Sequence, residues 1–120
     1  VSTPDAPSIR ATRRQLDTLD QLGYTWQRRT LVLNRANAKG GLPVAAVEAA
    51  LGLEAAFQIP ASRQIAAATN EGVAVVERGT ATAPGRSFEQ LARFLVPEPD
   101  RVDGVNGDRR KRFRGRRTGR

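Results

Sequence analysis

Short apolar runs alternate with segments of helical periodicity along most of the chain. Residues 31–33 form a short continuous apolar run, which is typical of a strand buried on both faces in a parallel sheet. Residues 55–59 are the next expected strand, shortened by Pro60. Around them, apolar side chains recur at the spacing of a helix that covers a core on one side. This alternation predicts an α/β fold, a doubly wound parallel sheet flanked by helices.

Turn and capping residues place four helices around these strands. We expect them over residues 7–22, over residues 43–51, between Ser62 and Gly72, and over residues 87–95. Asp5 or Ser8 can cap the first helix and Ser62 the third, and residues 87–90 have a capping-box sequence for the fourth. Trp26 is expected to pack before the first strand. The side chains expected to face inward are Ile9, Leu16, Leu19 and Leu22, then Val44, Val47 and Leu51, then Ile65 and Ala68, and finally Phe88, Leu91, Phe94 and Leu95.

Asn34 ends the first apolar run and carries informative chemistry. An Asn side chain offers a carbonyl acceptor and an amide donor, the pair that adenine presents in complementary order at N6 and N7. A residue just past the C-terminal end of a parallel strand lies where doubly wound folds bind ligands. Asn34 therefore marks a candidate adenine site.

From Val1 to Val96 the chain resembles the C-terminal half of the MinD/ParA superfamily of deviant Walker ATPases, and within it the CpaE/TadZ type of pilus assembly. The resemblance is carried by residues 31–35, Ile59-Pro60 and residues 70–72, together with residues 2–5 and the basic helix that follows. In this family the strand-end Asn recognises adenine and the Ile-Pro segment lines the base pocket. We therefore expect ATP to be bound by Asn34, Arg35, Pro60 and Ser62.

The chain also departs from the family pattern. Ser62 stands where the family often has an acid near the base or ribose, so a hydroxyl replaces a charge. The phosphate-binding loop, the switch carboxylates and the magnesium-binding acid lie upstream of Val1 in the family. Since the sequence has no Met and begins like the tail of a strand, we expect the N-terminal half of the domain to be missing, and expect no ATP hydrolysis by this chain alone.

Lys39-Gly40-Gly41 resembles the start of a phosphate-binding loop. The second Gly-Lys pair and the Ser or Thr that should follow are absent, and Pro43 removes an amide donor. We interpret the segment as a flexible connection from which Lys39 can approach a nucleotide. Elsewhere, no nucleophile-and-base arrangement stands out, and we assign no catalytic residue. Asn70 is expected to cap a helix end rather than to touch a ligand.

The amino-acid composition excludes several kinds of functional site. The chain of 120 residues has neither Cys nor His, which excludes a disulfide framework, thiolate chemistry and metal sites built on those residues. It has no apolar stretch of membrane-spanning length and no signal-peptide pattern, so we expect a cytoplasmic protein. Magnesium is expected only in a complete ATPase.

The net charge of +8 belongs to the C-terminus. Residues 1–96 form the expected α/β domain, and residues 97–108, rich in Pro, Gly and acids, a disordered linker. Residues 109–120 hold eight cations and no acid, whereas residues 1–108 are formally neutral. The cations of this tail are Arg109, Arg110, Lys111, Arg112, Arg114, Arg116, Arg117 and Arg120. They can neutralise nucleic-acid phosphates or anionic lipid headgroups, or form a merely solvated end; Gly115 and Gly119 disfavour an amphipathic membrane helix.

Three functions fit these observations. The leading one is the adenine-binding part of an ATP-dependent, dimerising switch in pilus assembly, secretion or spatial positioning. The second is a non-enzymatic module that binds nucleic acid or an anionic membrane through the tail. The third is a relative that keeps the fold and a protein-interaction surface but has lost the nucleotide.

Overall fold

The computed structural model describes residues 1–25, 27 and 29–96, in which helices and strands alternate as the sequence predicts. The elements are α1 (Ala6–Gln21), β1 (Leu31–Asn34), α2 (Val44–Leu51), β2 (Ala55–Ile59), α3 (Arg63–Asn70), the 3-10 helix η2 (Val75–Arg78) and α4 (Ala83–Leu95). The expected packing of Trp26, the linker 97–108 and the tail 109–120 all lie outside the described residues.

β1 belongs to a two-stranded parallel sheet and has a neighbour on each of its edges. On one side it pairs with β2 in parallel. On the other side it forms a parallel bridge with Ser2, whose amide donates to the Val32 carbonyl at 3.0 Å and whose carbonyl accepts from the Asn34 amide at 2.8 Å. With a neighbour on both edges and a helix layer on both faces, β1 is buried along the whole run Leu31 to Leu33, as expected for a central parallel strand.

The register between the two strands contains an irregularity. Leu31 faces Ala55, but the next residue, Val32, faces Phe57, so that Ala56 is passed over. Side chains alternate between the two faces of a strand, so this bulge brings Phe57 to the face of Val32 while Ala55 stays on the face of Leu31. The sheet can therefore place apolar residues of β2 on both faces.

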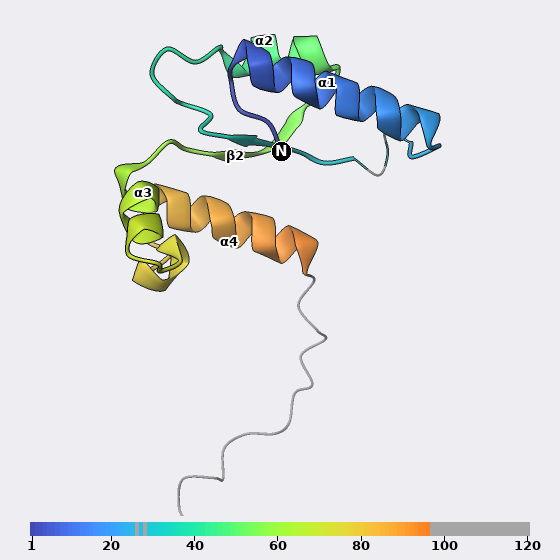
Figure 1. Cartoon of the computed structure of the whole chain (residues 1–120). Helices are drawn as coiled ribbons and strands as arrows, with labels where there is room; N and C mark the ends of the chain where they lie inside the picture. Colours follow the sequence, from blue (N-terminus) through green and yellow to red (C-terminus); the bar gives the residue numbers. More distant parts are fainter. Residues whose placement is uncertain (26, 28, 97–120) are drawn as a thin grey trace, which may run out of the picture.

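The helices form one layer on each face of the sheet (Figure 1). α1 and α2 cover the face of the core cluster Leu31, Leu33, Val47 and Leu51, against which Ile9, Leu16, Val44 and Ala55 pack. α3 and α4 lie on the other face, where the rings of Phe57 and Phe94 are 5.1 Å apart. This arrangement confirms the predicted α/β class with a parallel sheet flanked by helices.

Two of the predicted caps are present. The Asp5 carboxylate accepts a hydrogen bond from the Ser8 amide at 2.9 Å and begins α1. The Ser62 hydroxyl accepts from the Gln64 amide at 3.2 Å and begins α3. Both bonds satisfy amide groups that the first turn of a helix leaves without an intrahelical partner.

The prediction for the last helix was wrong at its start. α4 begins at Ala83, with Thr82 as its N-cap, so the expected capping Ser87 lies in the second turn, where its hydroxyl donates to the Ala83 carbonyl. Pro84 is tolerated because an amide in the first turn needs no intrahelical acceptor. Gly85 is required by contact, because a Cβ there would lie 2.6 Å from the Gly79 carbonyl oxygen.

Three expected inward positions are also exposed. Leu95, at the end of α4, is 65% exposed, and Leu22 is 66% exposed because α1 ends at Gln21. Phe94 touches Phe57 but remains 56% exposed, so its ring covers the sheet only in part. Helical spacing places these three residues on the apolar stripe, but they lie at or beyond the ends of their helices, where the structure leaves them exposed.

Candidate functional site

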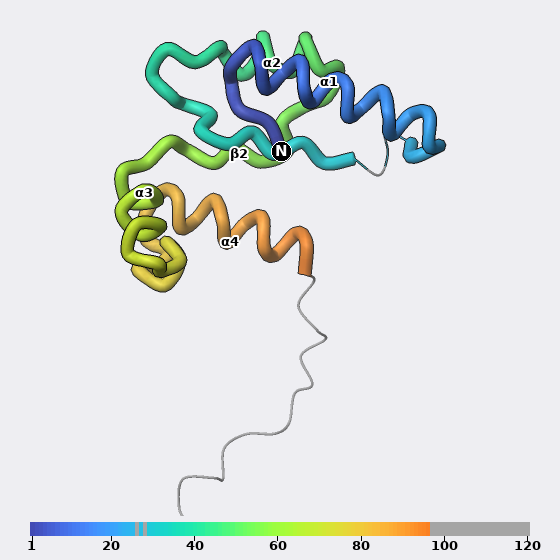
Figure 2. Tube along the Cα trace, viewed as in Figure 1, coloured from blue at the N-terminus to red at the C-terminus, as the bar shows by residue number. Residues whose placement is uncertain are grey.

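The chain leaves both strands at the same edge of the sheet, because β1 and β2 run parallel (Figure 2). Two hydrogen bonds join the segments that follow them. The Ala36 amide donates to the Ile59 carbonyl at 3.0 Å, and the Ala61 amide donates to the Asn37 side-chain oxygen at 2.7 Å. These bonds fix the loop after β1 against the loop after β2.

A hollow of about 580 Å³ opens at this edge. It contains the four residues that the sequence predicted for a nucleotide, Asn34, Arg35, Pro60 and Ser62. The remaining lining residues are Ala61, Arg63, Ile65 and Ala66. The fold thus brings together two motifs that lie 25 residues or more apart in the sequence, within a volume typical of small-molecule sites.

Asn34 is half-buried, with its side chain at the hollow and not in the hydrophobic core. Its Oδ1 accepts a hydrogen bond from the Arg35 amide at 3.0 Å, which supports the left-handed conformation of Arg35 (φ 55°). Its Nδ2 amide has no hydrogen-bond partner among the described residues. Asn34 can therefore offer a ligand two donors and the second lone pair of its oxygen.

The wall on the β2 side combines apolar surface with one hydroxyl. Pro60, Ile65 and Ala66 supply carbon atoms of the kind that cover the face of a planar base. The Ser62 oxygen accepts from Gln64 as the cap of α3, which leaves its own hydrogen free to donate. Ser62 can thus serve the helix and a ligand at once.

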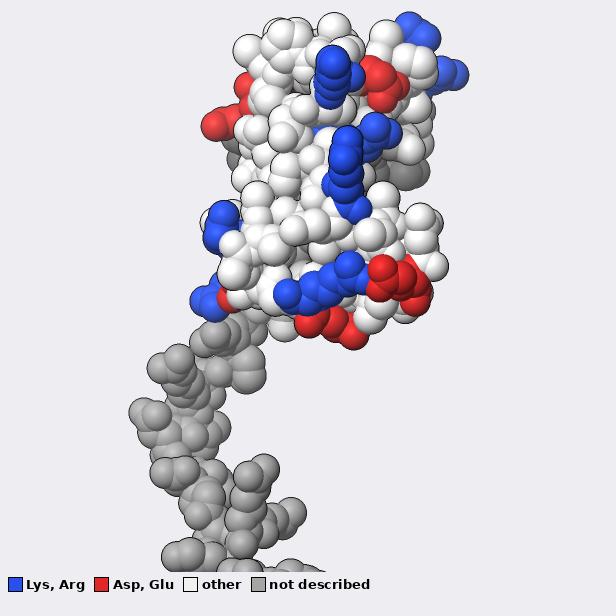
Figure 3. Space-filling view, turned by 90° about the vertical axis from the view of Figure 1, so that its left-hand side faces the viewer, with Lys and Arg blue, Asp and Glu red and all other residues white. Residues whose placement is uncertain are grey.

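The charged residues at this hollow are all cationic. Arg35 and Arg63 line it, and none of the described acids does. Figure 3 looks onto this edge of the molecule and shows Lys and Arg side chains gathered down the middle of the face. The formal neutrality of residues 1–108 gives no sign of this concentration of cations at one edge.

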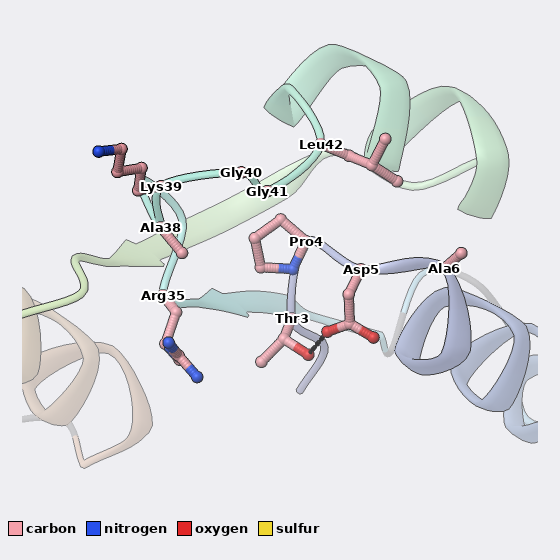
Figure 4. Close-up of a pocket in the computed structure, with 10 residues that line it drawn as sticks. All are labelled: Thr3, Pro4, Asp5, Ala6, Arg35, Ala38, Lys39, Gly40, Gly41 and Leu42. Carbon is pink, nitrogen blue, oxygen red and sulfur yellow. Dashed lines mark hydrogen bonds between the residues drawn. The ribbon is translucent and has the colours of Figure 1, made fainter.

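A second hollow, of about 400 Å³, adjoins the first through Arg35 and is drawn in Figure 4. Its other polar lining residues are Thr3, Asp5 and Lys39, and Lys39 points away from the Thr3 and Asp5 pair. The Thr3 hydroxyl donates to Asp5, and this bond, the Ser8 amide and the charge of Arg35 lower the pKa of Asp5. This hollow holds charges of both signs, unlike the first.

Residues 39–41 form a turn and not a phosphate-binding loop. The Gly41 amide donates to the Ala38 carbonyl at 2.9 Å, and the Leu42 amide donates to the Pro4 carbonyl at 2.8 Å. Gly41 lies so close to Pro4 that an added Cβ would be 3.0 Å from its ring. Gly41 therefore allows close packing against the segment before α1, whereas Gly40 has the positive φ of 79° that favours glycine.

Sequence reasoning missed Asn37, which joins the two loops. Its partner Ala61 is 24 residues away, so no local pattern gives the contact. Asn70 is exposed at the end of α3 and lies outside the hollow. The expected cap is not made by its side chain, since the turn there is closed by backbone bonds from Glu71, Gly72 and Val73.

Within the described part of the chain, no helix is long and apolar enough to cross a membrane. The same residues contain no group of three or more acids that could hold a metal ion. The polar side-chain groups that line the first hollow are the Asn34 amide, the Ser62 hydroxyl and the guanidinium groups of Arg35 and Arg63.

Comparison with known proteins gives a structural match. No family model and no curated protein sequence matches the chain. Among solved structures, the MinD cell division protein of Aquifex aeolicus superposes with a TM-score of 0.65 at 22% identity, over 78% of this chain and 41% of that one. The septum site-determining protein MinD of Pyrococcus horikoshii OT3, solved in complex with Mg-ADP, superposes with a TM-score of 0.68 at 20% identity, over 81% of this chain and 40% of that one. The chain thus spans about 40% of the length of these proteins, and over that span it has the fold of a MinD-like P-loop NTPase.

Proposed function

We propose that the hollow between the ends of β1 and β2 binds the adenine base of ATP. The observation that carries this proposal is the free amide of Asn34, held half-buried beside the apolar surface of Pro60, Ile65 and Ala66. A planar base needs apolar surface on its faces and directed polar groups at its edge, and the hollow offers both. The Mg-ADP complex of a MinD protein with this fold supports the choice of an adenine nucleotide.

Arg35 and Ser62 complete the proposed site. Arg35 follows Asn34 and borders both hollows, so it lies where a ligand that extends beyond the base would pass. Ser62 keeps a hydroxyl hydrogen for the sugar or the base. The described acids form no group of three or more that could hold magnesium.

The wider proposal is that this chain contributes the adenine side of a cytoplasmic, ATP-binding, dimerising switch. In such a protein, ATP promotes association of two copies, and the assembly positions a pilus or secretion machine. The MinD-like fold supports a switch of the MinD/ParA kind in general. The pilus assignment rests on the resemblance of residues 1–96 to the CpaE/TadZ type.

The test uses neutral ligands, so that the eight cations of residues 109–120 cannot attract them by charge. Adenosine and guanosine are titrated into the full chain labelled with ¹⁵N, and the Asn34 side-chain amide is followed by NMR. We expect that resonance to shift with adenosine, and adenosine to bind more tightly than guanosine. Asn34→Ala should weaken adenosine by about 1 to 3 kcal/mol, the discrimination of a bidentate Asn–adenine pair.

The matched control is Asn70→Ala, which removes an exposed Asn outside the hollow. It should leave adenosine binding unchanged. Equal affinity for adenosine and guanosine, or equal loss in both variants, would contradict the proposed site.

A further inference from the structure

Pro60, in the apolar wall of the adenine hollow, is held on both sides by the loop after β1. The carbonyl before it, on Ile59, accepts from the Ala36 amide at 3.0 Å. The amide after it, on Ala61, donates to the Asn37 Oδ1 at 2.7 Å. The first bond joins two backbone groups, so it does not depend on a particular side chain. The second bond requires the side chain of Asn37.

These two bonds leave little freedom to the backbone at Pro60. Its peptide bonds are planar, and its ring fixes φ at about −65°. Only ψ of Pro60 stays soft between the Ile59 carbonyl and the Ala61 amide, and the bond to Asn37 fixes the position of that amide. Without this bond, rotation about ψ would change the direction in which the chain continues into α3, which carries the rest of the apolar wall.

The segment between β2 and α3 has open space on two sides. Residues 60–63 border the adenine hollow, and they also border a further hollow of about 470 Å³, which is lined by Asn37 and the first residues of α4. The Ser62 cap ties the segment to α3, and the bond to Asn37 ties it to the loop that follows Asn34. The distance between this segment and Asn34 therefore depends on hydrogen bonds more than on packing.

Asn37 and Asn34 belong to one hydrogen-bonded stretch of chain. The Asn34 Oδ1 accepts from the Arg35 amide at 3.0 Å. The Arg35 carbonyl accepts from the Ala38 amide at 2.9 Å and closes the turn that contains Asn37. The side chain that would read the base and the side chain that holds the opposite wall are thus fixed to each other.

We propose that Asn37 is a positioning residue that sets the selectivity of the hollow for adenine. It lines the further hollow and not the adenine hollow, so it acts through the residues that it holds. The bond to Ala61 keeps the apolar wall at the distance from Asn34 at which a planar base can contact both. The inference rests on the proposed adenine site and adds a residue outside it. A wall that is held in place before binding gains affinity because less order is lost on binding.

The experiment measures the affinity ratio of adenosine to guanosine by NMR titration of the full ¹⁵N-labelled chain. Asn37→Ala removes the acceptor for the Ala61 amide and should lower this ratio by roughly three- to tenfold. Asn37→Asp keeps an oxygen acceptor and should retain the ratio, since the ligands are neutral. Hydrogen exchange of the Ala61 amide should accelerate in Asn37→Ala and not in Asn37→Asp, which verifies the bond itself.

Glu48→Ala is the matched control. The Glu48 Oε1 accepts from the Ala55 amide at 2.8 Å, so here too a side chain holds a backbone amide, at the opposite end of β2. Glu48 lines neither of the two hollows. Its truncation removes the same kind of bond and should leave the ratio unchanged. Asn37 is exposed in a turn, so Asn37→Ala leaves the core untouched, and thermal unfolding verifies the fold of each variant.

A double variant tests whether Asn37 acts through Asn34. In a chain that already carries Asn34→Ala, Asn37→Ala should change the ratio little, because the amide that it aligns with the wall is gone. Losses that add up in the double variant would show that Asn37 acts independently of Asn34, against the proposed role.

The outcomes are separable. If adenosine does not shift the Asn34 amide of the unchanged chain, the adenine site fails, and this inference fails with it. If adenosine binds selectively but Asn37→Ala keeps the ratio, or Glu48→Ala lowers it as much, the positioning role is wrong and the adenine site stands. A ratio that falls in Asn37→Ala and persists in both Asn37→Asp and Glu48→Ala supports the role of Asn37.

Discussion

Ser62 allows stability and binding to be changed independently at one position. Its oxygen accepts from the Gln64 amide at 3.2 Å and begins α3, while its side chain borders the adenine hollow. Ser62→Ala removes the cap and keeps the size of the residue nearly unchanged. Ser62→Asp restores an acceptor for the same amide and adds a negative charge at the hollow. The two variants therefore share the loss of the hydroxyl and differ in the cap.

The expected magnitudes follow from the cap. Loss of a Ser N-cap costs about 1 kcal/mol, within a range of roughly 0.5 to 2. α3 has eight residues, too few to be stable without packing and capping. For a domain of this size, 1 kcal/mol corresponds to a decrease of about 4 to 8 °C in Tm. Ser62→Asp should retain the stability of the original chain, because Asp is as good an N-cap as Ser.

The assay is urea denaturation followed by circular dichroism, with the adenosine titration on the same samples. Ser62→Ala should lower the denaturation midpoint, whereas Ser62→Asp should not. Both variants should weaken adenosine, because both lack the hydroxyl hydrogen that Ser62 offers the ligand. The reasoning is refuted if Ser62→Asp is as unstable as Ser62→Ala, because the bond to Gln64 would then contribute nothing.

Three further predictions concern packing and charge. Leu33→Ala removes a side chain that is 0% exposed and should cost about 2 to 5 kcal/mol in urea denaturation, whereas exposed Leu22→Ala should change stability by less than about 0.5; similar losses in both would contradict the assigned core. Gly85→Ala should destabilise by about 1 to 3 kcal/mol, although Ala usually favours a helix, because the new Cβ would lie 2.6 Å from the Gly79 oxygen; a gain in denaturation midpoint would show that this contact relaxes freely. The pKa of Asp5 is lowered in the folded chain, so its carboxylate stabilises the fold above the ordinary pKa near 3.8, and this contribution is lost as pH falls through the lower folded value. Asp5→Asn should therefore reduce the pH dependence of Tm between about pH 5 and pH 2. An unchanged pH dependence of Tm would show that other acids cause it.

Local patterns predicted the parts of the fold whose causes are local. The two strands were recognisable from their short apolar segments. The caps Asp5 and Ser62 were recognisable because each accepts a hydrogen bond from an amide no more than three residues away. The start of α4 was missed because Pro84 and Gly85 usually mark turns. In this fold the Pro falls in the first helical turn, and the Gly is required by a neighbouring backbone segment.

The candidate site was predictable in its residues but not in its surroundings. Asn34 could be named from the strand end that the sequence shows, and Pro60 from the resemblance to the MinD/ParA superfamily. Contacts between distant segments decide the bond from Ala61 to Asn37, the position of Arg63 and the lack of an acid among the described residues of the hollow. The overall charge also gave no help, because the formal net charge of zero over residues 1–108 does not show at which edge of the sheet the cations lie.

The skipped residue in β2 has a consequence for how this chain can vary. Because Ala56 has no partner on β1, Ala55 and Phe57 can face different helix layers. The same extra residue sets the register in which Ile59 pairs with Asn34. Deleting one residue between Gly52 and Pro60 would either turn the Phe57 side chain toward the opposite helix layer or move Pro60 away from the loop that follows β1. Substitutions in this strand should therefore be tolerated far better than any change in its length.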